Sequence, residues 1–250
     1  MTTRFAKAWL LTNLPVALVF IAWALVAQVL PVNAIIFPSP GSVLQDVIDH
    51  PYVYLHEGGV TFRASVYGLL LGVLMGTGMA LLSWCSFVLK SMLLPVSLLL
   101  ATIPVVAIIP IITRIFGPGM SSVLCVVTVV TFLPTFVAVS SGLHAVEHSH
   151  ESLFKVFGAR KWQQLRYLAI PAAVPHFMMA LGISAPSSVI GAMTAEYLIG
   201  SEGLGYQLRS AMANFATDRV VGGALLSTVM SIFFLSLAQS ACTRILARWG

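Results

Sequence analysis

Apolar residues fall into six long runs that are separated by shorter polar stretches. Each run is close to the roughly 20 residues that an α-helix needs to cross a bilayer. Because the alternation typical of barrel strands is absent, helices are the expected spanning elements. The predicted spans are residues 9–30, 60–84, 91–115, 122–143, 172–196 and 221–242. The pattern therefore predicts an all-α integral membrane protein whose 250 residues form one domain of six transmembrane helices.

The polar stretch between the first two runs has its own periodicity. Val43, Leu44, Val47 and Ile48 recur at three- and four-residue spacing. This spacing predicts a short amphipathic helix that lies at the membrane interface.

Two of the predicted spans contain unusual residue patterns. In the second span, small residues recur at strict four-residue intervals, a stripe that lets another helix approach closely. These residues are Gly68, Gly72, Gly76 and Ala80. We expect them to serve packing, and a glycine-lined substrate route is the alternative. The third span contains Pro95, Pro104 and Pro110. Proline kinks a helix and frees carbonyl groups, so this span is a candidate wall of a pathway.

Charge narrows the class of protein and predicts the topology. Only 8% of the residues are charged, whereas a soluble domain carries about 25%. The net charge of +5 comes from residues at the ends of runs and not from one patch, which argues against a nucleic-acid partner. Basic residues concentrate at both termini and in the loop of residues 144–171, and Lys90 lies in the turn between the second and third predicted spans. The positive-inside rule therefore predicts that both termini and this loop are cytoplasmic.

The loop of residues 144–171 is expected to form a compact knob on the cytoplasmic face. Ser152–Gly158 has the length of one or two helical turns, and Gly158 and Ala159 form a turn after it. In the run that follows, Trp162, Leu165 and Leu168 share one side of a second short helix. Such a knob is suited to docking with another protein.

At this loop the sequence resembles a known family. The pattern F-G-A-x-x-W-Q-x-L-x-x-L-x-x-P-A-x-x-P, residues Phe157–Pro175, is similar to the cytoplasmic loop of ABC importer permeases. The branch that it resembles carries sulfonates, taurine, nitrate and certain heterocyclic vitamins or precursors. In that family the loop forms a coupling helix, between the fourth and fifth spans, that docks into a groove of a separate ATPase subunit. The resemblance implies coupling roles for Glu151, Ser152, Gly158, Ala159 and Trp162. The usual Glu-Ala-Ala is replaced by Ser152-Leu153-Phe154, and Glu151 stands one place too early.

The resemblance also implies partners and a location. It implies two ATPase subunits that bind ATP and Mg, a second copy of the permease, and a soluble binding protein outside. The solute is then a sulfonate, a nitrate-like anion or a small heterocycle, and the location is a prokaryotic plasma membrane, the inner membrane in a Gram-negative cell. The chain has no Gly-x-x-x-x-Gly-Lys-Ser/Thr stretch, so we expect it to bind no cofactor itself and to be no enzyme.

Polar residues inside the predicted spans are candidates for the pathway or its gate. The hydroxyl candidates are Thr102, Thr131, Ser187 and Ser188. Glu196 is the last residue of the predicted fifth span. Inserting an acid into a membrane costs about 3 kcal/mol at the centre of a spanning helix, so an acid near membrane depth usually has a partner or a function. We expect it to form a gate contact or part of a polar cavity. The alternative is an acid at the helix end that pairs with Arg209 or Arg219.

Other functions remain as alternatives. His144 and His148 are four residues apart, as zinc ligands on a helix are, but we expect no metal site because they lie at a membrane boundary. An ATP-independent secondary carrier would need ionisable groups within the spans, and these are scarce. An intramembrane enzyme would use Ser187 or Ser188, for which no activating histidine is identified. A substrate-capturing membrane component of a vitamin transporter is the remaining alternative.

Overall fold

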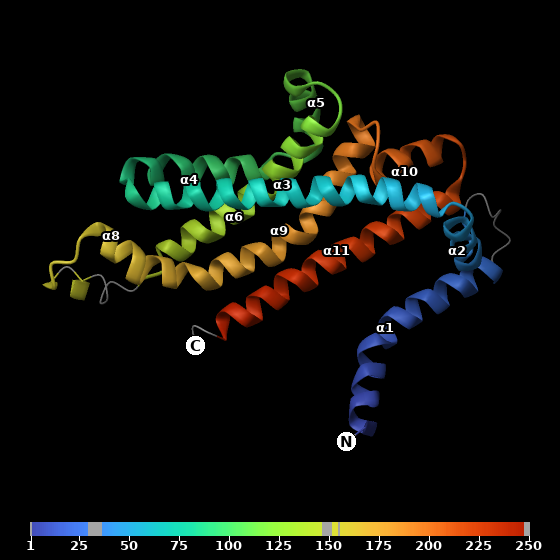
Figure 1. Cartoon of the computed structure of the whole chain (residues 1–250), viewed down its shortest axis with the longest axis horizontal. Coiled ribbons are helices and arrows are strands. Elements are labelled where there is room, and N and C mark those ends of the chain that lie inside the picture. Colours follow the sequence, from blue (N-terminus) through green and yellow to red (C-terminus); the bar gives the residue numbers. More distant parts are fainter. Residues whose placement is uncertain (1, 30–36, 147–151, 155, 248–250) are drawn as a thin grey trace.

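The computed structural model describes residues 2–29, 37–146, 152–154 and 156–247, and helices with short connections make up this part of the chain (Figure 1). Within the described residues no strand occurs, so the predicted all-α class is confirmed for them. The elements are α1 (Thr2–Val29), α2 (Pro40–Asp49), α3 (Pro51–Cys85), α4 (Phe87–Thr102), α5 (Val105–Phe116), α6 (Met120–Leu143), α8 (Lys161–Gln164), the π-helical turn η1 (Leu165–Ala169), α9 (Ile170–Ile199), α10 (Leu204–Ala213) and α11 (Thr217–Leu246).

Four helical segments are long and apolar enough to cross a membrane. They are Pro51–Cys85, Met120–Leu143, Lys161–Ile199 and Thr217–Ile245. These segments contain the predicted second, fourth, fifth and sixth spans. In α1 the apolar described stretch is the shorter Ala17–Val29. The count of six spans thus stays a prediction.

The predicted third span is not one continuous helix. Residues 91–115 are divided between α4 and α5, and Pro104 occupies the position before the first residue of α5. Proline lacks a backbone donor and disfavours helical geometry in the residue before it, so the helix stops at this point. The three prolines predicted a kink, and the structure has a break.

The predicted fifth span begins earlier than expected. The predicted second short helix of the loop is the start of a continuous helical segment, Lys161–Ile199. The π-helical turn η1 lies just before Pro171, and in it the Ile170 N–H donates to Leu165 O in the wider π pattern. The segment therefore continues as a helix past Pro171. Trp162 and Leu165 do not share one buried side, because Trp162 is exposed while Leu165 packs into the core.

Close packing of α3 against α6 lies at the centre of the fold. A Cβ atom on Gly68 would lie 2.4 Å from the Val127 side chain, and one on Gly72 only 1.9 Å from Thr131 Oγ1. On Gly76 it would lie 2.9 Å from Phe132 O. The stripe of small residues therefore serves helix packing, as expected, and α6 in turn packs against α9.

The predicted interfacial helix is α2, which is joined to the spans by a polar cluster. Asp46 forms an ion pair with Arg219 of α11 at 2.9 Å and accepts a hydrogen bond of 2.7 Å from Tyr54 of α3. Burial acts to raise the pKa of Asp46, but the hydrogen bonds from Arg219 and Tyr54 outweigh it and hold that pKa below its ordinary value. The cluster thus fixes α2 across the ends of α3 and α11.

Candidate functional site

The first candidate site is the knob, which we define as the described residues 152–154 and 156–164. Its first helical turn ends at Gly158, where φ is +66°. The Phe157 N–H donates to Leu153 O at 3.0 Å, and the Ala159 N–H donates to Phe154 O at 2.9 Å. This is the hydrogen bonding of a helix end closed by a residue in the left-handed conformation, which favours glycine. The expected turn at Gly158 is therefore present.

Two glutamines begin the second part of the knob. The Arg160 N–H donates to Gln163 Oε1 at 2.7 Å, so the side chain of Gln163 caps the start of α8. Gln164 Nε2 donates to Ala159 O at 3.1 Å. Sequence reasoning quoted Gln163 as part of the motif but missed this function. The signal was a glutamine three residues after Arg160, the residue before α8, which is the spacing of a capping side chain.

The knob presents apolar side chains to its surroundings. Val156 is 83% exposed and Phe157 is 81% exposed, and Leu153 and Trp162 are exposed as well. On the opposite side, Leu165 packs into a core cluster with residues of α3, α6 and α9. An exposed apolar patch of this kind is typical of a protein interface.

The remaining residues predicted for coupling or metal binding are placed as follows. Ser152 lies on the first helical turn of the knob, and Glu151 and His148 lie outside the described residues. His144 Nδ1 lies 2.7 Å from Ser140 O. No group of three metal-ligating side chains occurs in the part of the chain that the structure describes.

The four predicted pathway hydroxyls come from different environments. Thr131 and Ser188 are fully buried, Ser187 is half-buried and Thr102 is exposed. Each donates to a backbone carbonyl of its own helix, and Thr131 also donates to Gly68 O at 3.2 Å. Thr131 thus takes part in the packing of α3 against α6. A pathway role for these four residues stays a prediction.

The second candidate site is a buried carboxylate at the end of α9. Glu196 is 1% exposed, and its Oε2 atom accepts hydrogen bonds from Thr61 Oγ1 at 2.7 Å and from the Gly205 N–H at 3.1 Å. Thr61 Oγ1 accepts in turn from the Leu204 N–H at 2.8 Å, and the Gly203 N–H donates to Glu57. We call these residues the Glu196 clamp. The clamp joins α3, the end of α9 and the loop before α10.

The alternative partners predicted for Glu196 are wrong. Arg209 donates to Tyr197 O, Leu198 O and Gly200 O, so it satisfies the carbonyls at the end of α9. Arg219 pairs with Asp46. Hydroxyl and backbone donors hold the carboxylate instead, and such donors cannot be identified from sequence spacing.

The glycines of the resembled Gly-Leu-Gly stretch are required by close approach. A Cβ atom on Gly203, whose φ is +99°, would lie 2.3 Å from the carboxyl carbon of Glu196. A Cβ atom on Gly205 would lie 2.1 Å from Met193 O. The loop can therefore close over Glu196 only with glycine at both positions.

Removing the Thr61 hydroxyl is expected to loosen the clamp. In Thr61→Val, the buried Leu204 N–H loses its acceptor and Glu196 loses a donor, at a cost of about 1–3 kcal/mol for each group. We expect a lower unfolding temperature and faster hydrogen exchange at residues 201–207, measured on the purified protein by mass spectrometry. Thr194→Val is the matched control, because Thr194 is half-buried and its hydroxyl donates to Ile190 O of its own helix. Equal rates of hydrogen exchange at residues 201–207 in the two variants would contradict the role of Thr61 in holding the Glu196 clamp together.

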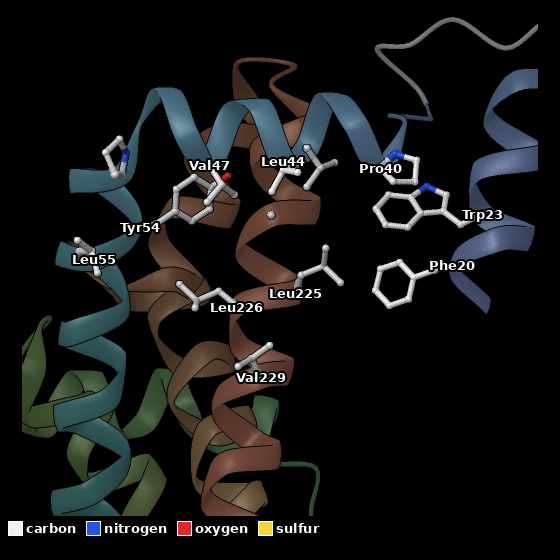
Figure 2. Close-up of a pocket in the computed structure, with 13 residues that line it drawn as sticks. Phe20, Trp23, Pro40, Leu44, Val47, Tyr54, Leu55, Leu225, Leu226 and Val229 are labelled. Carbon is white, nitrogen blue, oxygen red and sulfur yellow. The ribbon is translucent and has the colours of Figure 1, made fainter. Parts of the chain in front are cut away.

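A separate cavity of about 610 Å³ lies under α2, between α1 and the helices α3 and α11 (Figure 2). Its lining is almost entirely apolar, as Leu44, Leu226 and Val229 illustrate. Two polar groups of its lining are already paired, because Trp23 Nε1 donates to Pro38 O and the Tyr54 hydroxyl donates to Asp46. The cavity is therefore unsuited to a polar solute.

Comparisons with known proteins agree with these features. Residues 68–249 match the family described as binding-protein-dependent transport system inner membrane component. A probable ABC transporter permease of Haemophilus influenzae is 32% identical over 217 residues, which are 87% of this chain and 89% of that protein. The formylaminopyrimidine transport permease ThiX of Halalkalibacterium halodurans is 29% identical over 86% of each chain. The putative aliphatic sulfonates permease SsuC of Bacillus subtilis is 24% identical over 91% of this chain and 83% of its own.

The fold has a solved counterpart. A chain from inward-facing crystals of the MetNI methionine ABC transporter superposes with a TM-score of 0.64, at 19% identity, over 80% of this chain and 99% of that one. The resemblance found at the loop motif is confirmed by the match over residues 68–249. The chain belongs to the family of inner membrane components of binding-protein-dependent transport systems, the permeases of ABC transporters.

Proposed function

We propose that this permease is the translocation subunit of an ATP-driven importer and that the knob is its coupling site. The exposed apolar patch on the knob carries the proposal, because it is held on the end of the helix that runs from Lys161 to Ile199. Ser152, Gly158, Ala159 and Trp162 are the proposed coupling residues, together with Glu151. The ATP and Mg belong to two partner ATPase subunits, and no nucleotide site is proposed on this chain.

The proposed assembly follows from the size of the permease. Two copies would form the pathway at their shared interface, and a soluble binding protein would deliver the solute from outside. We propose six spans with both termini and the knob in the cytoplasm, because the basic residues Arg160 and Lys161 lie in the knob and Arg166 directly follows it. The location is the plasma membrane of a prokaryote, the inner membrane in a Gram-negative cell.

The proposed solute is a small nitrogen heterocycle. The relative that transports formylaminopyrimidine is more similar to this chain than the putative sulfonate permease is, at 29% against 24% identity. An aliphatic sulfonate is the second candidate, supported by the SsuC match over 91% of this chain. Movement of the two knobs on nucleotide binding would switch the spans between inward and outward openings, which is a two-state change.

Reconstitution with candidate ATPase and binding-protein partners tests this proposal. The permease should co-purify with the ATPase in mild detergent. Proteoliposomes should take up a labelled aminopyrimidine only when ATP is present on the side of the membrane where the ATPase subunits lie. A labelled aliphatic sulfonate, supplied with the same partners, distinguishes the two solute classes. Uptake without any ATPase would support the secondary-carrier alternative and overturn the proposal. Chemical conversion of the solute without ATP would also overturn the proposal, and it would support the intramembrane-enzyme alternative.

A further inference from the structure

A cleft of about 460 Å³ lies between α5 and the end of α9. The helix α5 packs against α6 and α9, and it projects beyond the neighbouring helices (Figure 1). The apolar side chains that line the cleft are Val106, Ile109, Pro110, Leu198 and Ile199. Its volume falls within the roughly 300–1,000 Å³ of ligand sites, and a mostly apolar lining is typical of such sites. The cleft is therefore large enough to hold a small ligand or one chain of a larger ligand.

The apolar lining of this cleft contains one positive charge. Its two polar residues are Thr113 and Arg114, and the Thr113 hydroxyl already donates to Ile109 O at 2.9 Å. Arg114 is exposed, and its guanidinium forms no hydrogen bond or ion pair with any residue that the structure describes. The described residues that line the cleft include no acid. Because a guanidinium stays charged and offers five N–H donors, the cleft is suited to an anionic group.

The cation and the apolar walls are expected at different depths in the membrane. Arg114 is one residue before the end of the predicted third span, and Leu198 is two residues past the end of the predicted fifth span. In the proposed topology these two ends reach the same membrane surface. Val106 and Pro110 precede Arg114 by about two turns and one turn of α5, so they lie further inside the predicted span. With this topology the cleft leads from a cation near the lipid headgroups to an apolar trough among the acyl chains.

A phospholipid has the same arrangement of charge and apolar chain. We propose that the cleft binds one anionic phospholipid, whose phosphate contacts Arg114 and whose acyl chain lies along Val106 and Pro110. Arginines at span ends commonly reach the headgroups, and here the apolar cleft beside Arg114 adds a surface that holds one acyl chain in place. The unpaired guanidinium favours a lipid with a net negative charge over a zwitterionic lipid. This inference goes beyond the proposed function, because it does not depend on the solute.

Competition between two lipids tests the proposal. The full-length permease is placed in nanodiscs that contain equal amounts of phosphatidylglycerol and phosphatidylcholine with the same acyl chains, so that the two lipids differ in net charge. After release into mild detergent, native mass spectrometry identifies the most tightly retained lipid. We expect phosphatidylglycerol to exceed phosphatidylcholine about fivefold, because one arginine near the membrane surface attracts an anionic lipid by about that factor. Equal retention of the two lipids, or of neither, would overturn the proposal.

Two pairs of variants locate the bound lipid. Arg114→Gln should abolish the preference for phosphatidylglycerol. Arg63→Gln is its control, because Arg63 is also exposed but lies outside the lining of the cleft, with its Nε donating to Gly59 O. Val106→Trp should fill the trough and remove the retained lipid. Ile111→Trp makes the same addition at another exposed position of α5, outside the lining, and should retain the lipid.

Each remaining outcome contradicts the proposal. An unchanged preference in Arg114→Gln, or an equal loss in Arg63→Gln, would show that the headgroup is attracted without this cleft. Displacement of the lipid by 1-hexanesulfonate would assign the cleft to a small anionic solute. A disulfide between two copies of Val106→Cys would show that a second copy of the chain covers the cleft. If a variant does not fold, the comparison of the two lipids on the wild-type chain still decides.

Discussion

Gly72→Val is expected to prevent the chain from reaching its folded state in good yield. The first atom of the new side chain would lie 1.9 Å from Thr131 Oγ1 and 2.7 Å from Thr128 O. The Thr131 hydroxyl is held by hydrogen bonds to Gly68 O and Val127 O, and the Thr128 oxygen belongs to the backbone of α6. The clash is therefore relieved only by breaking these bonds and shifting the backbone. We expect a destabilisation of roughly 3 kcal/mol, at the upper end of the cost of overpacking. Thermal unfolding and the monodisperse fraction in detergent measure it.

The control for this variant lies on the same helix. A Cβ atom on Gly78 meets nothing within 4 Å, so Gly78→Val adds the same side chain to α3 without a clash. We expect its unfolding temperature to stay close to that of the wild type. If both valines had the same effect, helix propensity and not the contact between α3 and α6 would be the cause.

Gly158→Val is expected to abolish most of the coupling while leaving the membrane helices folded. A β-branched residue at φ +66° is strongly disfavoured, at a cost of about 1–2 kcal/mol. The strain comes from the backbone alone, because a Cβ atom there meets nothing within 4 Å. The turn that presents Phe157 and Trp162 would therefore change shape. We expect the affinity for the ATPase to fall about tenfold or more, measured by co-purification and surface plasmon resonance, and ATP-dependent uptake to fall with it.

Gly158→Asn separates conformation from side-chain bulk. Asparagine adopts the left-handed region more readily than other residues with a Cβ atom, so this variant should keep most of the ATPase affinity. The unfolding temperature of both variants should match that of the wild type, because Gly158 is exposed and lies outside the packed helices. If Gly158→Val kept full affinity for the ATPase, the turn at Gly158 would not be part of the proposed coupling site.

Periodicity and turn chemistry predicted much of this fold because they act locally. The stripe at Gly68, Gly72 and Gly76 packs as its spacing indicated, and the turn predicted at Gly158 is present, with a positive φ. Apolar length alone did not reveal the break at Pro104, because a largely apolar stretch of 25 residues has the same pattern whether one helix or two form it.

The rest of the site depends on contacts between distant parts of the chain. Thr61 and Glu196 are 135 residues apart, and their hydrogen bond exists only because α3 and α9 meet at one end. The passage of the helix through Pro171 depends on η1, and a π-helical turn has no simple sequence signature.

One uninterrupted helical segment has the knob at its start and the Glu196 clamp at its end. Lys161–Ile199 contains 39 residues and is about 58 Å long at 1.5 Å per residue, about twice the thickness of a hydrocarbon core. Its two ends lie at opposite sides of the molecule, near α8 and α10 (Figure 1). Under the proposed function, we expect such a segment to act as a lever: a partner that tilts the helix at Trp162 would also displace Glu196, because no loop lies between them. The points at which the lever can bend are η1, Pro175 and Pro186. Under the proposed function, the openings at the two membrane faces are therefore expected to be mechanically dependent on each other.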